Sequence, residues 1–585
     1  MNDARKTKRR TALAVLAIFA VVALFVVRLV DIQVVSAADL NEQSLSKRSV
    51  SQTTYGSRGN IVDTNGNVLA DSVDRFDITA SPLLVDTFDR KGDDGKTVQV
   101  AVVDAINELS VATGAAATDI TTALTEKPGS NFAYVAKSVT LEQLAAVRAL
   151  GIPWVYDELH PSRTYPMGSV AGNLVGFIGT DGPQNGLEKT QDTCVGSSNG
   201  SSTYERGADG VRIPGSTVTT KAATDGGTLK LTIDSDFQWY AQQTLAQRSI
   251  ELGADWGTIV VVRVSDGHLM AVADYPSVDP NNVGGVTSSD LGSRAFSSPF
   301  EPGSTMKALT VASLLDAGTI TPTTQVNVPG RRDLGNGQSI KDSWAHGDIR
   351  YTATGILTNS SNIGTSFLAD SLGADARRDY MTKFGLNSLT AVNFQGESSG
   401  LVRPTSEWDA VTNYAVQFGQ GMTATSAQMA SAYQALGNGG VHMPLTLVEG
   451  CTMPDGTVTD LPSTEGTRVV SEAAADTTVA MMENVVTQGS LKNALSIPGY
   501  NVAAKTGTAE VADANGYGSD RIISIAGLVP AEAPEYAIVV TFAKPDTMKT
   551  SGAVASTFKK ITTQVIKTFK IAPSTVPATT YPLNF

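Results

Sequence analysis

The sequence predicts a membrane-anchored α+β protein, and three observations lead to this fold class. A basic N-terminus precedes one long apolar stretch, strand-like pairs occur at both ends of the C-terminal region, and a helix-rich segment separates those pairs. The sheet must therefore combine segments that lie far apart in the chain. With 585 residues, the chain is too long for one ordinary domain, and we expect two or three.

The composition permits large cores and argues against a nucleic-acid partner. Apolar residues make up 41% of the chain and charged residues only 17%. The net charge is −13, whereas phosphate binding needs a positive field.

The N-terminus predicts the compartment. Five Lys and Arg residues occupy the first ten positions, and residues 12–35 are apolar over more than the roughly 20 residues that cross a bilayer. The basic flank should stay in the cytoplasm, which places the chain after about residue 36 outside it. A signal peptide cleaved near Ala37 is the alternative, but the stretch is longer than most signal cores. We predict a cytoplasmic tail over 1–10 and a single-pass anchor over 11–35.

After the anchor, residues 36–225 alternate short elements with polar loops, and helical spacing of apolar residues occurs at 98–113 and 141–150. The pattern of the sequence changes near residue 226, and we predict a second domain over 226–585. It begins with a short strand, followed by a helix that starts after the N-cap Asp234. The remaining predicted elements are one hairpin over 258–264 and 269–273, a second strand pair over 522–529 and 536–542, and a closing helix over 557–569.

The cysteines and histidines suggest no metal site, and we expect no cofactor. Cys194 and Cys451 are compatible with one disulfide outside the cytoplasm, or with two free thiols. The four histidines lie far apart, without metal-ligand spacing: His160, His268, His346 and His442.

Three short motifs carry the candidate chemistry: SxxK at 304–307, SxN at 360–362 and KTG at 505–507. Each is weak alone, because SxxK occurs twice more in the chain and SxN once more. A helix cap or a solvated strand end explains any one of them equally well. Their order and their contexts together make the stronger signal.

Ser304 follows a Pro-Gly turn and opens a predicted helix, so its hydroxyl lies near free backbone N–H groups. Lys307 falls on the same helix face and can take the serine proton only if its ammonium is destabilised. We therefore predict that Lys307 is buried. Ser360 and Asn362 lie on a polar loop or helix end, where they can relay a proton and hold a substrate amide.

The KTG motif is predicted to lie on an edge strand that lines a cleft. There Lys505 offers positive charge, Thr506 and Thr508 can bind a carboxylate, and Gly507 lets a substrate backbone approach.

The ordered set resembles that of penicillin-binding proteins and serine β-lactamases. The flanks at 300–304, 418–421 and 505–510 look like those of class B penicillin-binding proteins, and so do residues 58–63 near the N-terminus. Two further segments resemble the family's N-terminal pedestal: Arg163-Thr164-Tyr165-Pro166 and Gly186-Leu187-Glu188. Thr64 departs from the family, in which Arg is common at this position.

The resemblance implies an elongated pedestal (dimerisation-like) domain and a penicillin-binding domain with an antiparallel sheet, helices on both faces and a helical subdomain. It implies a D,D-transpeptidase in which Ser304 attacks the penultimate D-alanine of a peptidoglycan stem peptide. Lys307 is the implied base, and the N–H groups of Ser304 and Thr508 form the oxyanion hole. Ser360 relays protons, Asn362 positions the substrate, and Lys505 holds its carboxylate together with the motif threonines.

The resemblance also implies β-lactam binding and a multi-pass membrane glycosyltransferase as partner within a division or elongation complex. The membrane exit at residues 28–33 favours the septal division type. Two rivals remain open: a D,D-carboxypeptidase or β-lactamase, in which water accepts the acyl group, and a non-catalytic β-lactam sensor or division scaffold.

Overall fold

The computed structural model separates the chain into two units, one comprising residues 1–57 and 197–225 and the other residues 58–196 and 226–585. The residues that it describes are 2–92, 95–179, 181–205, 207, 213–335, 337–513 and 516–585.

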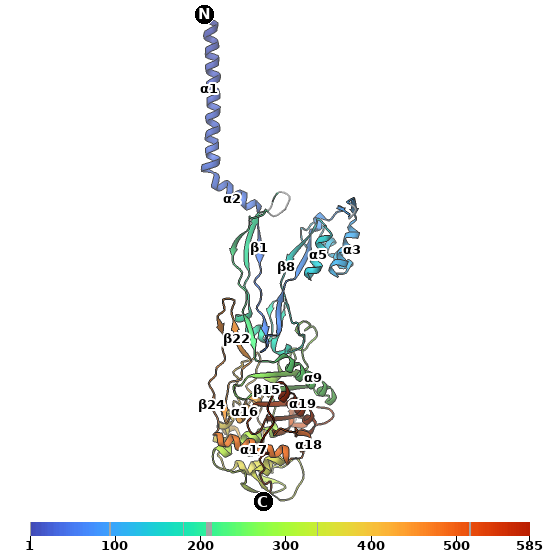
Figure 1. Cartoon of the computed structure of the whole chain (residues 1–585), viewed down its shortest axis with the longest axis vertical. Helices are drawn as coiled ribbons and strands as arrows, with labels where there is room; N and C mark the ends of the chain where they lie inside the picture. Colours follow the sequence, from blue (N-terminus) through green and yellow to red (C-terminus); the bar gives the residue numbers. More distant parts are fainter. Residues whose placement is uncertain are drawn as a thin grey trace. The chain divides into compact units, whose positions relative to one another are not determined.

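In the smaller unit, the predicted anchor is a continuous helix, α1 (Asn2–Val30), followed by one π-helical turn to Val35 (Figure 1). This stretch is long and apolar enough to cross a membrane, and its side chains are exposed. The unit also contains α2 (Ala37–Arg48) and an antiparallel sheet of β1 (Ser49–Thr54), β12 (Gly200–Glu205) and β13 (Val218–Lys221).

In the larger unit, five antiparallel strands form the central sheet, and they come from two distant parts of the sequence. Their order is β16 (Leu269–Tyr275), β15 (Trp256–Arg263), β27 (Tyr536–Ala543), β26 (Gly516–Val529) and β25 (Ala503–Asp513). Both predicted strand pairs are confirmed. Ile259 packs into one core and Val260 into the other, so both faces of the sheet are buried.

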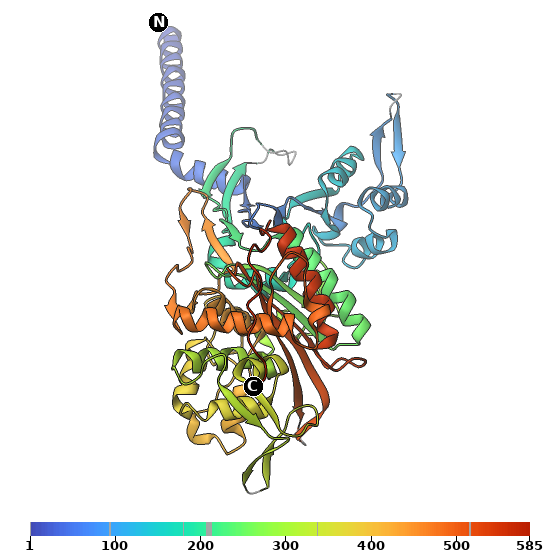
Figure 2. The ribbon, with the colours of Figure 1, turned by 60° about the horizontal axis from the view of Figure 1, so that its bottom comes forward.

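Helices cover both faces, as the resemblance implied. Helices α9 (Ser235–Leu252) and α19 (Gly552–Thr568) lie side by side against one face (Figure 2). The opposite face carries α16 (Ser426–Gly437), with α17 (Glu472–Thr487) beside it. The predicted N-cap is confirmed, because Asp234 accepts a hydrogen bond from the Phe237 N–H at 2.9 Å.

Most of the N-terminal strands of this unit belong to two larger sheets, one of which also includes later strands of the chain. One has the order β23 (Val458–Thr459), β22 (Val448–Thr452), β14 (Thr228–Leu231), β2 (Ile61–Val62), β3 (Val68–Val73) and β9 (Ser162–Thr164). The other has the order β7 (Ala133–Val139), β4 (Phe76–Ala80) and β8 (Val155–Leu159), and packs with α3 (Val102–Thr113), α4 (Ala117–Thr125) and α5 (Leu141–Ala149).

Two helix starts were predicted wrongly. The closing helix, predicted from residue 557, begins at Gly552. Residues 98–100 belong to strand β6 (Thr97–Val100), which pairs with β5 (Phe88–Lys91), and the helix begins at Val102. The alternating Val98 and Val100 fit a strand as well as a helix, so local spacing did not separate the two.

Cys194 and Cys451 form a disulfide, which resolves the choice that the sequence left open. The bond joins the short helix α8 (Asp192–Val195) to strand β22 across 257 residues of sequence.

Candidate active site

Ser304 lies in a 3₁₀ turn, Gly303–Thr305, that continues directly into helix α11 (Met306–Asp316). Ser304 is half-buried, whereas Lys307 is fully buried. The predicted helix start and the predicted burial of Lys307 are both confirmed.

The Ser304 turn is held by backbone contacts from two other segments. Gly303 donates its N–H to the Gly419 carbonyl at 2.9 Å, and the Tyr433 hydroxyl donates to the Thr305 carbonyl at 2.8 Å. A Cβ at Gly419 would lie 2.2 Å from the Gly303 oxygen. The motif segments 300–304 and 418–421 are therefore in direct contact.

The SxN motif connects two helices and faces Lys307. Ser360 ends α12 (Ala353–Asn359) with φ of +59°, an uncommon conformation for serine, and α13 (Asn362–Ala369) begins two residues later. Lys307 Nζ lies 2.5 Å from the Ser360 carbonyl, 2.7 Å from Asn362 Oδ1 and 3.2 Å from Ser360 Oγ.

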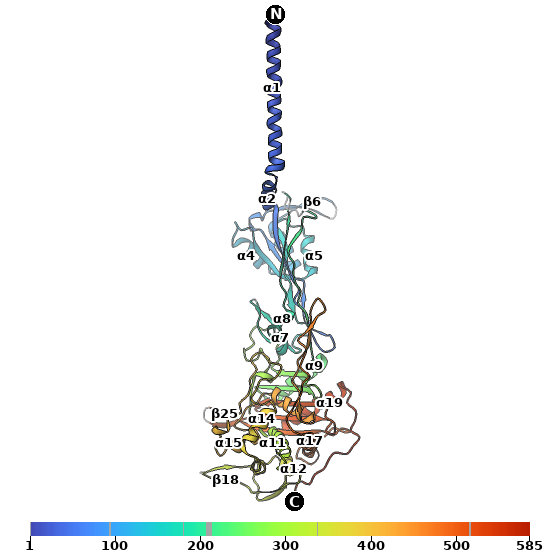
Figure 3. The ribbon, with the colours of Figure 1, turned by 90° about the vertical axis from the view of Figure 1, so that its left-hand side faces the viewer.

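The KTG motif lies on β25, which is an edge strand, as predicted (Figure 3). Lys505 is fully buried and its Nζ donates to Ser360 Oγ at 3.0 Å, so the Ser360 hydroxyl lies between two lysine amines. On the same strand Thr506 is half-buried and Thr508 is exposed.

Gly507 makes room for the protein itself. A Cβ there would lie 2.5 Å from Ser524 Oγ and 2.9 Å from the Pro302 carbonyl. This glycine therefore allows the edge strand to pack against the turn that carries Ser304.

The environment favours a neutral amine on Lys307. Burial lowers its pKa well below the ordinary lysine value, the positive charge of Lys505 lowers it further, and Asp342 partly opposes both. A neutral amine has two N–H groups, which can donate hydrogen bonds to the Ser360 carbonyl and to Asn362 Oδ1, and its lone pair is then available as a base. Burial also lowers the pKa of Lys505 to about 7.

Asp342 is a site residue that the sequence did not indicate. Its buried carboxylate accepts a hydrogen bond from Ser361 Oγ at 2.7 Å and another from the Ile363 N–H at 3.0 Å. It thereby holds the turn between α12 and α13. Asp342 belongs to no recognised motif and lies in a polar segment without periodicity, so the chain offered no signal for it.

The pedestal motifs also converge. Glu188 is fully buried and receives hydrogen bonds from Arg58 Nε at 2.7 Å and from Arg163 Nε at 2.6 Å. Thr64, the departure from the family pattern, donates to Glu449 at 2.9 Å.

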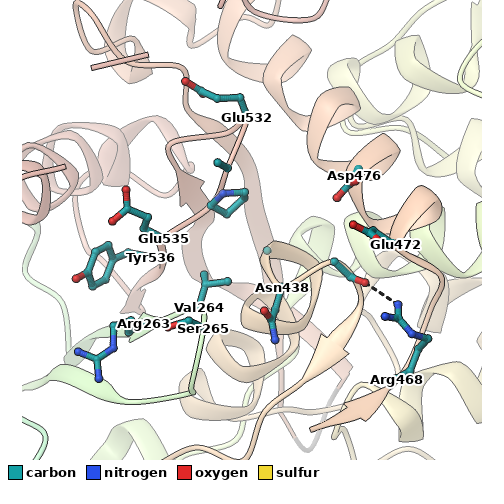
Figure 4. Close-up of a pocket in the computed structure, with 14 residues that line it drawn as sticks. Arg263, Val264, Ser265, Asn438, Arg468, Glu472, Asp476, Glu532, Glu535 and Tyr536 are labelled. Carbon is teal, nitrogen blue, oxygen red and sulfur yellow. Dashed lines mark hydrogen bonds between the residues drawn. The ribbon is translucent and has the colours of Figure 1, made fainter. Parts of the chain in front are cut away.

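A separate cavity of about 590 Å³ contains none of the motif residues. Figure 4 shows that it is bordered by acidic side chains and by Arg263 and Arg468, and that Arg468 donates to a backbone carbonyl, that of Gly439. Because its lining holds neither Ser304 nor a buried lysine, it is not the candidate active site. The acidic residues are Glu472, Asp476, Glu532 and Glu535.

This sheet, with a serine, two buried lysines and an SxN turn at its edge strand, defines a class of protein. Residues 257–563 match the penicillin binding protein transpeptidase domain, and residues 53–231 match the penicillin-binding protein dimerisation domain. The chain belongs to the penicillin-binding protein transpeptidase family, as a class B member with both domains.

Individual relatives resemble the chain over most of its length. Penicillin-binding protein PbpB of Mycolicibacterium smegmatis is 35% identical over 91% of this chain and 85% of its own. Peptidoglycan D,D-transpeptidase FtsI of Escherichia coli is 30% identical over 93% and 89%. Penicillin binding protein 3 of Mycobacterium tuberculosis, solved in complex with aztreonam, is 27% identical, covers 91% of this chain and 100% of its own, and has a TM-score of 0.68.

Proposed function

We propose that this protein is a membrane-anchored peptidoglycan D,D-transpeptidase that cross-links stem peptides through an acyl-enzyme on Ser304 and is acylated by β-lactams. The observation that carries the proposal is the buried network in which the Ser360 hydroxyl lies between the Lys307 and Lys505 amines. A scaffold has no need of two desolvated lysines, which are costly to bury.

In the first step, the neutral Lys307 amine takes the proton of Ser304, whose oxygen attacks the penultimate D-alanine carbonyl. The N–H groups of Ser304 and Thr508 stabilise the oxyanion, an effect worth a few kcal/mol per donor. Asn362 positions the substrate, while Lys505, Thr506 and Thr508 bind the terminal carboxylate. Gly507 contributes by letting the strand that carries these residues pack against the Ser304 turn.

In the second step, the leaving nitrogen gains a proton through Ser360, and terminal D-alanine departs. The amine of a neighbouring stem then attacks the ester carbonyl, transfers its proton back through the same network, and releases Ser304. No net proton is gained or lost over the cycle, because Lys307 returns to its neutral form.

We propose the domain layout of a tail over 1–10, an anchor over 11–35, a pedestal over 36–225 and a transpeptidase domain over 226–585. The exposed apolar helix and the disulfide support a location in which the bulk of the chain is extracytoplasmic. A multi-pass membrane glycosyltransferase of a division complex is the partner that supplies the glycan strands.

The test is to incubate the detergent-solubilised full chain with a fluorescent penicillin and to locate the label by peptide mass spectrometry. We expect a stable adduct on Ser304 that is absent from Ser304→Ala. Ser556→Ala is the matched control, because it removes the exposed serine of another SxxK sequence.

A folded protein without adduct would contradict the proposal and favour the scaffold. Rapid release of the label from Ser304 would instead identify a hydrolase, in which water accepts the acyl group.

A further inference from the structure

His346 has hydrogen-bond acceptors on both ring nitrogens. Its Nδ1 lies 2.6 Å from the Gly347 carbonyl, and its Nε2 lies 3.0 Å from Asp342 Oδ2. A carbonyl can only accept, and an ionised carboxylate can only accept. Both contacts are therefore favourable only when the pair holds one proton more than a neutral imidazole and a carboxylate. Because imidazole is a stronger base than carboxylate, that proton belongs on the ring.

The pair is enclosed. The side chain of Asp342 is fully buried, that of His346 is almost fully buried, and the Trp344 ring lies 5.5 Å from the imidazole between ring centres. Asp342 also accepts hydrogen bonds from Ser361 Oγ and from the Ile363 N–H. The carboxylate is thus fixed next to the SxN motif, to which Lys307 is hydrogen-bonded.

Few other charges face this pair. Lys307 of α11 and Tyr351 of β20 (Ile349–Thr352) both feel the charge of Asp342, and Lys505 lies beyond Ser360. The chain neighbours Lys341 and Asp348 are exposed to solvent. An uncompensated Asp342 therefore acts mainly on Lys307.

We propose that His346 carries the proton that cancels the charge of Asp342 and thereby keeps the Lys307 amine in its neutral, proton-accepting form. His346 is a positioning residue, because it acts on the reaction through Asp342. The inference deepens the proposed function and rests on it. Supporting it, the Asp342 charge raises the pKa of Lys307 against the effects of burial and of Lys505.

The chain offers a matched pair of variants. His346→Gln keeps a donor toward Asp342 but removes the charge. Asp342→Asn removes the carboxylate charge but keeps an oxygen for the Ile363 N–H and an amide that can donate to Ser361 Oγ and to a neutral His346. Neither residue is a group that touches the substrate.

The experiment measures the acylation rate of the full chain by fluorescent penicillin between pH 5 and 9, in the wild type, His346→Gln, Asp342→Asn and the double variant. At low pH the acylation rate falls because Lys307 becomes protonated. In His346→Gln, this acidic limb of the profile should move to higher pH by about half a unit or more, which corresponds to a roughly threefold slower rate at a given pH on the limb. In the double variant, the limb should return to the wild-type position, because the charge is gone.

An unchanged limb in His346→Gln would overturn the proposal, and so would a shift that the double variant does not reverse. Wild-type protein that is never acylated would refute the proposed function instead. If His346→Gln fails to fold, ¹⁵N-histidine NMR of the wild type decides. The His346 ring should be doubly protonated in the pH range in which the wild type is acylated and neutral there in Asp342→Asn, and a neutral ring in the wild type overturns the inference.

Discussion

Lys307 and Lys505 flank the same hydroxyl, yet their proposed tasks require opposite charge states. Lys307 must be neutral to accept the Ser304 proton, whereas Lys505 must be positive to hold a carboxylate. Burial favours the neutral form of both, and the hydrogen bonds to Ser360 connect them. Catalysis is therefore expected only in the pH interval where the two lysines share one proton.

Replacing Lys307 by Met, which fills a similar volume without an amine, should slow acylation by a factor of about 10² to 10⁴, the range of general-base catalysis. Stopped-flow acylation by a fluorescent penicillin measures the rate, and the unfolding midpoint verifies that the variant is folded. A rate within tenfold of wild type would show that another group takes the Ser304 proton.

Raising the pH above about 7 should weaken β-lactam capture, because Lys505 loses its proton near that pH and with it the attraction for a carboxylate. Above the pH at which Lys505 loses its proton, the second-order rate constant for acylation should fall by about tenfold per pH unit. A penicillin methyl ester has no carboxylate and provides the control. An equally steep alkaline limb with the ester would contradict this role for Lys505.

At the scale of elements, the site depends on the close approach of backbones from three segments. The turn before α11 contacts the glycine-rich loop at 418–421 through Gly303 and Gly419, and β25 through Gly507. A side chain at either contact would separate the segments. Packing at the van der Waals limit makes the site rigid and intolerant of added atoms.

Gly419→Ala should lower both stability and acylation, whereas Gly421→Ala should lower stability only slightly. Both glycines have positive φ, which costs alanine about 1 kcal/mol. Only at Gly419 does the new Cβ collide with the Gly303 backbone, since at Gly421 the nearest atom is 3.6 Å away. We expect an additional loss of about 2 kcal/mol and at least tenfold slower acylation for Gly419→Ala.

Urea unfolding and acylation kinetics of the two variants, measured side by side, check this expectation. Equal effects in both would show that backbone conformation, and not contact with the Ser304 turn, limits these positions.

At the scale of the whole molecule, the disulfide is the long-range covalent link in the larger unit. It closes a loop of 257 residues, and both cysteines are buried. Closing so long a loop restricts the unfolded chain and stabilises the fold by about 5 to 6 kcal/mol in the chain-entropy description.

Cys194→Ala combined with Cys451→Ala should therefore lower the unfolding midpoint markedly. Acylation per folded molecule should not change, because the bond lies outside the catalytic motifs. Thermal melts of oxidised wild type, reduced wild type and the variant provide the measurement. Identical midpoints would mean that the bond adds no stability.

Much of the fold could be predicted from local patterns. The anchor follows from an apolar run, α9 from its N-cap and spacing, and both strand pairs from alternating or continuous apolar segments. Residues 98–100 were predicted wrongly, because their spacing satisfies two periods and only the pairing of β6 with β5 decides between them.

The sequence by itself determined the residue types, their order and the helix-start context of Ser304, since these depend on chemistry that is local in the chain. Only the tertiary structure decided that Lys307, Ser360 and Lys505 meet, that Cys194 pairs with Cys451, and that Asp342 and His346 support the SxN turn. Those contacts join segments separated by up to 257 residues. Burial and hydrogen bonding between such segments arise only once the sheet and its helices have packed, so no local pattern encodes them.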